Sequence, residues 1–294
     1  MEKQRMSFSA FKEEKILSGL SPALNVLISA ARRAGRSVVR DFSELEALQS
    51  SGRRAFDFAN KAAQKAENTL VKYLQMARPR YSFLLPDGKR IAGEDTSNCF
   101  IINALDGKDN FIRAIPFFSV SVALLRDNDI LAGVVYNPVS DELFYAEKGC
   151  GAFLMSGNGD RRVRVSACNE IADSLIAVDF SAQSKDEVKD YQDRLSSVIE
   201  GSAGVRRLGC VSLAMAYTAS GKFDGHWCRY ADVTETAAGC IIVKEAGGHV
   251  SASDGNAKIP EMLYKRSIIS ANDGLDVLLT RALRDKTKKE KAAE

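Results

Sequence analysis

The stretch NALDGKDNF (residues 103–111) places acidic and amide side chains directly after an apolar run. Residues 100–105 are almost entirely apolar and predict a short strand, and Asp106-Gly107 then predicts a tight turn. Asp106 therefore lies at a strand end, where an acidic side chain can ligate a hard cation such as Mg²⁺. An acid followed by glycine is also common in ordinary turns, so this stretch by itself leaves both interpretations open.

Two further segments carry acidic residues at comparable places. Gly93-Glu94-Asp95 follows a predicted strand, and Thr234-Glu235-Thr236 opens a predicted helix. Converging from three segments, these carboxylates could form an oxygen-ligand site that holds Mg²⁺ against a phosphate ester and activates water. An acid at a helix start is equally typical of a helix cap, so the residue types alone favour a structural role.

Hydrophobic periodicity divides the chain into two sections. Ser21-Pro22 opens an amphipathic helix, and a second helix is predicted from about Phe58 to Met76. Short strands with tight turns then indicate an antiparallel sheet, and strands and helices alternate from residue 174 onward. Strands are predicted at residues 100–105, 119–127, 130–138 and 142–149, and later helices at 212–221 and 234–248. The predicted organisation is an N-terminal arm (1–20), an α+β subdomain (21–170), an α/β subdomain (171–280) and a basic tail (281–294).

The composition excludes several classes of protein. Hydrophobic residues make up 45% and charged residues 27% of the 294 residues, which is typical of a globular protein. The net charge of +3 gives no electrostatic argument for direct nucleic-acid binding. No apolar run of about 18 residues predicts a membrane span, and the N-terminus lacks the apolar core of a secretory signal. The six cysteines form no CxxC pair, which argues against structural zinc and favours reduced cysteines in the cytoplasm.

Taken together, the three acidic segments resemble the motifs of the inositol monophosphatase family in order and spacing. The family pattern reads G-E-E, then D-P-I-D-G-T-x-N-F, then W-D-x-A-A-G followed by E-A-G-G. This chain carries GED at 93–95, NALDGKDNF at 103–111, TETAAG at 234–239 and EAGG at 245–248. The resemblance extends over roughly residues 22–275. It implies a five-layer αβαβα sandwich, a cytoplasmic homodimer, and Mg²⁺-dependent hydrolysis of a small phosphomonoester.

The resemblance also implies the members of the site. As metal ligands it implies Glu94, Asn103, Leu105, Asp106 and Glu235. The catalytic residues carried over in the same way are Glu94, Asp106, Lys108 and Asn60. Substrate contacts are expected from Gly107, Lys108, Asp109, Gly209, Cys210 and Cys228.

Several of these positions depart from the family pattern. Asn60 and Asn103 replace acids, Glu235 is one methylene longer than the family aspartate, and Lys108 replaces the threonine that helps to hold the nucleophilic water. A neutral amide is a weaker Mg²⁺ ligand than a carboxylate, and a nearby ammonium group repels the cation. The first hypothesis is therefore a pseudoenzyme with a degraded Mg²⁺ site and weak or lost activity. It would bind a phosphorylated ligand or a protein partner, and Lys108 would neutralise the remaining acids.

Two alternatives stay open. The chain could be an active Mg²⁺-dependent phosphatase of an inositol phosphate or another small sugar phosphate, with rearranged ligands and Lys108 on the phosphate. It could also be an anion-binding module in which Lys108 and the helix amides near Thr234 hold phosphate without cleaving it. Mg²⁺ is the expected cofactor of the active form only. Cys228 stands where inositol-cleaving members carry the acid that binds a sugar hydroxyl, so inositol specificity is not expected.

Overall fold

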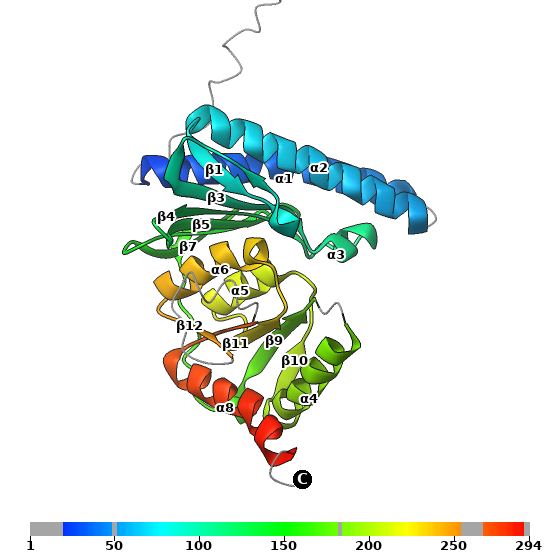
Figure 1. The fold of residues 1–294 in the computed structure, drawn as a ribbon, viewed down its shortest axis with the longest axis vertical. Helices are drawn as coiled ribbons and strands as arrows, with labels where there is room; N and C mark the ends of the chain where they lie inside the picture. The colour runs from blue at the N-terminus through cyan, green and yellow to red at the C-terminus, as the bar shows by residue number, and fades with distance from the viewer. Residues whose placement is uncertain (1–19, 49–51, 182–183, 254–266, 291–294) are drawn as a thin grey trace, which may run out of the picture.

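The computed structural model describes residues 20–48, 52–181, 184–253 and 267–290. These residues form five layers, which are a helix pair, an eight-stranded sheet, a second helix pair, a five-stranded sheet and a third helix pair (Figure 1). The layer order confirms the predicted αβαβα sandwich. The expected N-terminal arm lies almost entirely outside the described residues.

The first layer consists of α1 (Pro22–Leu48) and α2 (Gly52–Ala77). The Ser21 hydroxyl accepts a hydrogen bond from the backbone N–H of Leu24 at 3.1 Å, so the predicted N-cap of α1 is present. The apolar faces of both helices pack on the first sheet. α2 begins before the predicted start near Phe58, because buried Ala55 extends the apolar face of the helix.

The first sheet has the strand order β2-β1-β3-β4-β5-β6-β7-β8. Its strands are β1 (Tyr81–Leu84), β2 (Arg90–Ile91), β3 (Asp95–Asp106), β4 (Ser119–Arg126), β5 (Asp129–Asn137), β6 (Glu142–Glu147), β7 (Gly151–Ser156) and β8 (Gly159–Arg162). β1 and β3 pair in parallel, and the other neighbours in this sheet pair antiparallel. Phe100 and Ile102 pack toward α1 and α2, whereas Ile101 packs on the opposite face. Both faces of the sheet are therefore buried.

The second sheet has the strand order β10-β9-β11-β13-β12. Its strands are β9 (Leu175–Phe180), β10 (Gly204–Arg206), β11 (Gly225–Arg229), β12 (His249–Ala252) and β13 (Ser267–Ala271), and the short helix η3 (Ile171–Asp173) precedes β9. β9 runs parallel to both β10 and β11; the chain passes from β9 to β10 on one side, and then from β10 through α5 to β11 on the other side. The carboxyl end of β9 is therefore a topological switch point.

The middle layer consists of α5 (Val211–Ala219) and α6 (Val233–Glu245), which are buried almost throughout because each lies between two sheets. The approach is close at Gly133 of β5. A Cβ atom added there would lie 2.5 Å from Cγ2 of Ile241 on α6. A side chain larger than hydrogen at this position would separate the first sheet from the middle helices.

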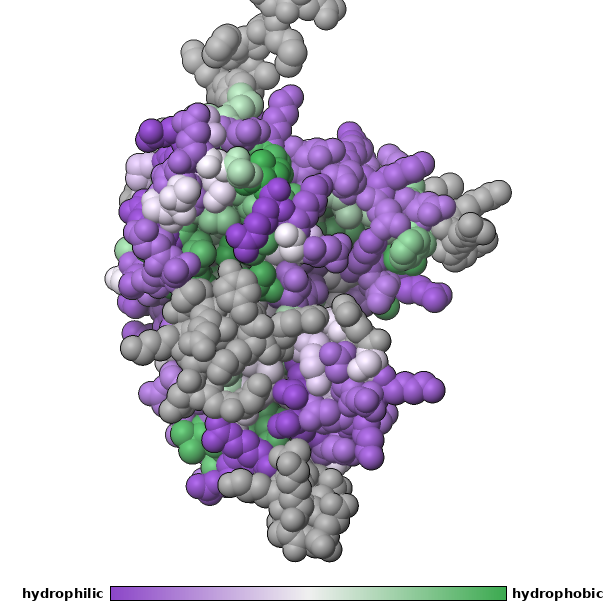
Figure 2. Space-filling model, viewed as in Figure 1, coloured by the Kyte–Doolittle hydropathy of each residue, from purple (hydrophilic) through white to green (hydrophobic). Residues whose placement is uncertain are grey.

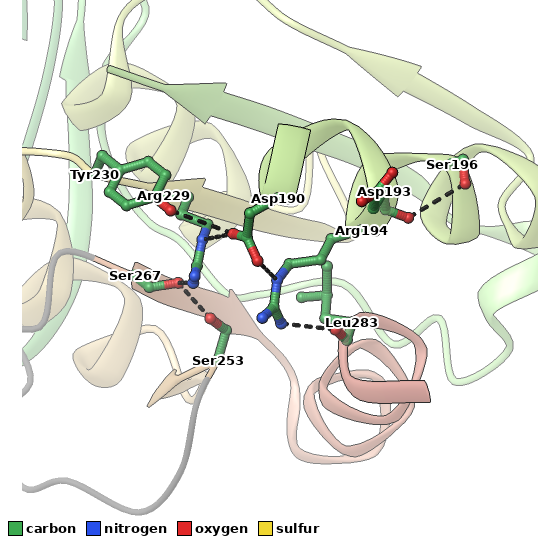
Figure 3. Close-up of polar contacts among 9 residues, drawn as sticks. All are labelled: Asp190, Asp193, Arg194, Ser196, Arg229, Tyr230, Ser253, Ser267 and Leu283. Atoms are coloured by element: carbon green, nitrogen blue, oxygen red, sulfur yellow. Dashed lines mark hydrogen bonds and ion pairs between the residues drawn. The ribbon is translucent and has the colours of Figure 1, made fainter. Parts of the chain in front are cut away.

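The outer layer consists of α4 (Lys185–Gly201) and α8 (Asp273–Glu290). Figure 3 shows how the Asp190 carboxylate joins α4 to the second sheet. It contacts Nε of Arg194 at 2.9 Å and Nε of Arg229 at 2.5 Å. Arg194 also donates to the backbone carbonyl of Leu283 on α8 at 2.9 Å, so one ionic cluster ties three elements together.

The surface and the C-terminus complete the fold. α8 continues through the predicted basic tail to Glu290, the last described residue. Figure 2 shows a visible face covered mainly by hydrophilic side chains. None of the helices in the described part of the chain is both long enough and apolar enough to cross a membrane.

Candidate functional site

One cavity of about 720 Å³ collects side chains from both sheets and from the helices between and outside them. Its lining comes from α2, the turn after β1, the end of β3, the end of β9, the loop after β10 and the start of α6. The predicted site residues that line it are Asn60, Asn103, Leu105, Asp106, Gly107, Lys108, Asp109, Gly209 and Glu235. Segments that lie far apart in the sequence, such as those that carry Asn60 and Glu235, therefore meet at this cavity.

Asp106 is the last residue of β3 and is 4% exposed. The backbone N–H and the hydroxyl of Ser212, in the first turn of α5, donate to its Oδ2 at 2.8 and 2.6 Å. Burial raises the pKa of Asp106 above its usual value. The two hydrogen bonds from Ser212 lower the pKa, but by less than burial raises it. The carboxylate is thus held in a fixed orientation, and a nearby positive charge would stabilise its ionised form.

Gly107 makes the predicted turn after Asp106. Its φ of 85° lies in the left-handed region, and an added Cβ would come within 2.9 Å of the Phe117 carbonyl oxygen. The short helix α3 (Lys108–Ile112) begins directly after it. Glycine is required here both by the backbone conformation and by the space.

Glu235 lies in the first turn of α6, where it caps the helix and lines the cavity. Its Oε2 accepts a hydrogen bond from the backbone N–H of Asp232 at 2.7 Å, and Asp232 accepts one from the N–H of Thr234 at 2.9 Å. Burial, followed by the charge of Asp106, raises the pKa of Glu235 to about 8. The backbone N–H of Thr234 therefore already donates to a carboxylate of this chain. It is not free to bind phosphate, as the anion-binding alternative requires.

Lys108 extends along the cavity wall toward α2. Its Nζ donates to Oδ1 of Asn60 and lies 5.2 Å from the centre of the Phe56 ring. On the strand side, Oδ1 of Asn103 accepts a hydrogen bond from the backbone N–H of Leu105 at 3.2 Å. Each amide that replaces an acid of the family pattern thus has a hydrogen-bond donor, and one of these donors is the Lys108 ammonium group.

Glu94 does not reach the cavity, and the structure corrects its predicted placement. It is exposed and directly precedes β3, whereas Asp106 is the last residue of this 12-residue strand. At about 3.3 Å per residue, the two ends of β3 are on the order of 30 Å apart. The cavity is instead lined by Pro86 and Asp87 of the short helix η2 (Pro86–Gly88), because β1 runs parallel to β3 and ends at the same edge.

Two predicted substrate contacts, Cys210 and Cys228, lie outside the cavity lining. Both side chains are fully buried in the core around α5 and α6. The Cys210 thiol lies 3.3 Å from the Ser119 hydroxyl, and burial raises the pKa of both thiols well above the usual value. Packing in the middle layer, rather than contact with a ligand, accounts for these two cysteines.

Sequence reasoning missed four charged residues of the cavity lining, namely Glu67, Asp87, Asp179 and Arg207. Asp179 is 2% exposed and lies near the carboxyl end of β9. Its Oδ1 accepts a hydrogen bond from the backbone N–H of Gly209 at 3.1 Å, and its Oδ2 lies 3.4 Å from Nε2 of His226. An acid within the apolar run 175–180 was the available signal, because buried acids are rare without a partner or a function.

The cavity is strongly acidic. Six acidic and two basic side chains line it, and the acids outnumber the bases even while Glu235 is protonated, so a phosphate ester would meet net repulsion unless a cation entered with it. Mg²⁺ in proteins is typically held by one or two carboxylates, water and the phosphate of the substrate. Asp106 and Glu235 each use one oxygen for a protein hydrogen bond, so this donor set fits one cation shared with a phosphate. It does not form an all-protein cage, since no group of three or more His, Cys, Asp or Glu side chains within the described ranges could hold a metal ion.

Comparisons with known proteins agree with this architecture. A model of the Inositol monophosphatase family matches residues 19–288. An inositol-1-monophosphatase of Mesorhizobium japonicum is 38% identical over 264 residues, which cover 90% of this chain and 97% of the relative. A Nus factor SuhB of Pseudomonas aeruginosa is 34% identical, with 86% of this chain and 92% of that protein covered.

A solved structure is similar over the same length. The extragenic suppressor protein suhB of Bartonella henselae is 39% identical, matches with a TM-score of 0.79, and covers 90% of this chain and 100% of its own. Family match, fold and motif order thus agree over most of the sequence. The chain belongs to the inositol monophosphatase family.

Proposed function

We propose that this protein is a Mg²⁺-dependent phosphomonoesterase acting on an inositol phosphate or another small sugar phosphate, with a rearranged set of ligands. The observation that carries the proposal is the pair Asp106 and Glu235, two buried acids at the wall of an acidic cavity, where burial raises the pKa of both and the charge of Asp106 further raises that of Glu235. Such a pair is stabilised by a shared cation, and the cavity needs a cation before it can accept a phosphate. This favours the active alternative over the degraded site of the first hypothesis.

The residues of this chain have distinct roles in the proposal. Asp106, Glu235 and Leu105, through its backbone carbonyl, would hold Mg²⁺, which supplies positive charge to the phosphate oxygens and acidifies bound water. Ser212 fixes the orientation of the Asp106 carboxylate through two hydrogen bonds. Lys108 donates to a phosphate oxygen, as a point charge held at the cavity wall by Asn60.

The relatives support the same reaction class. Proteins named inositol-1-monophosphatase are 38% and 40% identical to this chain over most of their length. We extend their activity to this chain because Asp106, Gly107 and Glu235 lie together in one cavity. The homodimer expected from the resemblance stays a prediction.

A second candidate function is phosphate-ligand binding without turnover. The contact between Lys108 and Asn60 favours it, because the ammonium group lies beside the position where the family pattern carries an acid. A lysine there can neutralise part of the negative charge of the cavity without a metal. Several relatives are named Nus factor SuhB rather than inositol monophosphatase, so this family includes proteins named for another role.

Phosphate release decides between the two functions. The full chain is incubated with myo-inositol 1-phosphate and a set of small sugar phosphates, with Mg²⁺ or with EDTA. We expect Mg²⁺-dependent release that falls at least about a hundredfold in Asp106→Asn, because this variant removes a charged ligand. Asp173→Asn, an exposed acid in η3, is the matched control and keeps full activity.

Each outcome has a clear meaning. Release from the wild type no greater than from Asp106→Asn contradicts the proposed enzyme. In that case, calorimetric binding of inorganic phosphate without Mg²⁺, lost in Lys108→Met, would establish the binding function.

A further inference from the structure

We propose that Ser119 is a positioning residue for the metal ligand Asp106, on which it acts through the hydroxyl group of Ser212. This inference rests on the proposed function, because it concerns how tightly the same site holds Mg²⁺. Ser119 lies in β4, outside the cavity lining, so it sets the properties of the metal site without contact with the metal or the substrate.

The first argument is an irregularity at the end of β3. Asn103 of β3 lies opposite Ser121 of β4. Asp106 lies opposite Ser119, so three steps along β3 match two steps along β4. This β-bulge adds one residue to β3 and turns the next side chain to the other face of the sheet. The two residues between Asn103 and Asp106 both pack toward α1 and α2, whereas Asp106 points toward α5 on the same face as Ser119.

The second argument is the row of hydrogen bonds that reaches Asp106 from the interior. The Ser119 hydroxyl lies 2.7 Å from the Ser212 hydroxyl, which in turn donates to Oδ2 of Asp106 at 2.6 Å. The backbone N–H of Ser212 also ends on Oδ2, so this oxygen is the acceptor. A hydroxyl group carries only one proton, and that of Ser212 is directed to Asp106. Ser119 is therefore the donor in its hydrogen bond to Ser212.

The third argument is the environment of this row. The Cys210 thiol lies 3.3 Å from the Ser119 hydroxyl and 3.5 Å from the backbone carbonyl oxygen of Asp106, so it can donate to either oxygen. Ser119, Cys210 and Ser212 are all fully buried, so solvent does not compete for their hydrogen bonds. Hydrogen bonds in such a buried row polarise and strengthen one another. Removal of Ser119 should therefore weaken the bond that Ser212 makes to the carboxylate.

The row gives the two oxygens of the Asp106 carboxylate different roles. Oδ2 accepts both donors of Ser212, so Oδ1 is the oxygen that remains for a cation in the cavity. Without Ser119, the buried Ser212 hydroxyl loses a donor and is free to turn away from Asp106. The carboxylate then has more than one orientation, whereas Mg²⁺ demands near-ideal octahedral geometry. Ser119 thus raises the affinity of the site for Mg²⁺.

The test is a double-mutant cycle on Mg²⁺ binding, which does not depend on turnover. Mg²⁺ is titrated calorimetrically, in the presence of inorganic phosphate, into the wild type, Ser119→Ala, Ser212→Ala and the double variant. We expect the dissociation constant of Mg²⁺ to rise about three- to tenfold in Ser119→Ala, the usual effect of one lost hydrogen bond. Because Ser119 acts through Ser212, the double variant should bind Mg²⁺ no more weakly than Ser212→Ala alone.

Two further variants separate positioning from general damage to the fold. Ser119→Cys keeps a hydrogen on the γ atom, so its dissociation constant should lie between those of the wild type and Ser119→Ala. Ser270→Ala removes an equally buried hydroxyl from β13, outside the cavity lining, and should leave Mg²⁺ binding unchanged. Melting temperatures in EDTA report the stability of each variant. A lower melting temperature of Ser119→Ala without weaker Mg²⁺ binding would show a structural role only.

Phosphate release from myo-inositol 1-phosphate, measured in parallel, separates this inference from the proposed function. Absence of turnover in the wild type, together with the expected cycle of Mg²⁺ affinities, contradicts the phosphatase and supports the role of Ser119. Turnover with equal Mg²⁺ affinities in the wild type and Ser119→Ala, or with additive effects in the double variant, overturns the role of Ser119 and leaves the phosphatase intact. A wild type that binds no Mg²⁺ overturns both.

Discussion

Ionisation of Glu235 opposes folding of the metal-free protein. Its pKa is raised from the usual 4.5 to about 8, first by burial and then by the charge of Asp106. The unfolded chain releases this proton near pH 4.5, whereas the folded protein retains it until about pH 8. The free energy of unfolding should therefore fall as the pH rises through this window.

Glu235→Gln removes this effect. In EDTA, the melting temperature of the variant should equal that of the wild type near pH 4.5 and exceed it near pH 8. Thermal unfolding followed by circular dichroism across this range provides the measurement. Parallel pH profiles for the two proteins would contradict the assigned cause.

Lys108 sets the concentration of Mg²⁺ that the site needs. Its ammonium group shares the cavity with Asp106 and Glu235, so it competes electrostatically with a cation. A unit charge about 4 Å away costs on the order of 1–4 kcal/mol, depending on the effective dielectric constant. Lys108→Met should lower the half-saturating Mg²⁺ concentration about tenfold or more, and raise KM for the phosphate ester.

In Lys108→Met, the half-saturating Mg²⁺ concentration should fall while KM for the ester rises. A general loss of structure would not produce these opposite changes. Lys72→Met, on the exposed side of α2, is the matched control and should change neither value. A higher Mg²⁺ requirement in Lys108→Met would show that the lysine assists metal binding instead of competing with it.

At the scale of elements, the contact between β5 and α6 leaves no room for a methyl group. A Cβ at Gly133 would lie 2.5 Å from Ile241 and 2.9 Å from the carbonyl oxygen of Ala238. Gly133→Ala should lower the free energy of unfolding by about 1–3 kcal/mol, measured by urea denaturation. Gly157→Ala, at a turn with nothing within 4 Å of the added atom, should change it by less than about 0.5 kcal/mol.

Asp190 joins the outer helices to the second sheet (Figure 3). Burial alone would raise its pKa, but Arg194 and Arg229 hold it below the usual 3.8. Its stabilising effect is thus present at neutral pH and is lost as the pH falls below about 4. Asp190→Asn should lower the free energy of unfolding by about 1 kcal/mol at pH 7 and by much less at pH 3, whereas Asp193→Asn on the same helix should not.

Most helices and strands could be predicted from the sequence because their signals are local. Ser21-Pro22 marks a helix start, and apolar runs mark β4, β5 and β6. The position of Glu94 could not be predicted in this way, since it depends on the parallel pairing of β1 with β3, which are neighbours in the sheet although β2 lies between them in the sequence. Motif spacing placed GED at the site, but this pairing brings Pro86 and Asp87 there instead.

At the scale of the molecule, the cavity depends on both sheets at once. Asp106 belongs to the first sheet, Asp179 to the second, and Glu235 to the layer between them. Mg²⁺ with inorganic phosphate at about 100 times the dissociation constant should add about 2.7 kcal/mol to the stability. One cooperative transition should shift upward in differential scanning calorimetry, and the shift should vanish in Asp106→Asn. Two transitions of which only one shifts would contradict this coupling.

The sequence also limits what could be inferred about the whole site. The motifs around Asp106 and Glu235 could be found because each lies within a short, ordered pattern. Asp179 and Arg207 have no such pattern, and only the crossover from β9 to β10 and β11 brings them to the cavity. Sites assembled by long-range topology are in this way less visible in a sequence than sites built from local motifs.

The inner face of the first sheet has a consequence for synthesis of the chain on the ribosome. The strands of this sheet are complete at Arg162, but α5 and α6, which cover Ile101, Ala123 and Val135, lie at residues 211–245. A nascent chain therefore exposes an apolar sheet face during translation of about eighty further residues, which takes several seconds at typical elongation rates. During this interval the unfinished protein depends on chaperones or on slow local collapse to avoid aggregation, and a message truncated between these points would encode an insoluble product.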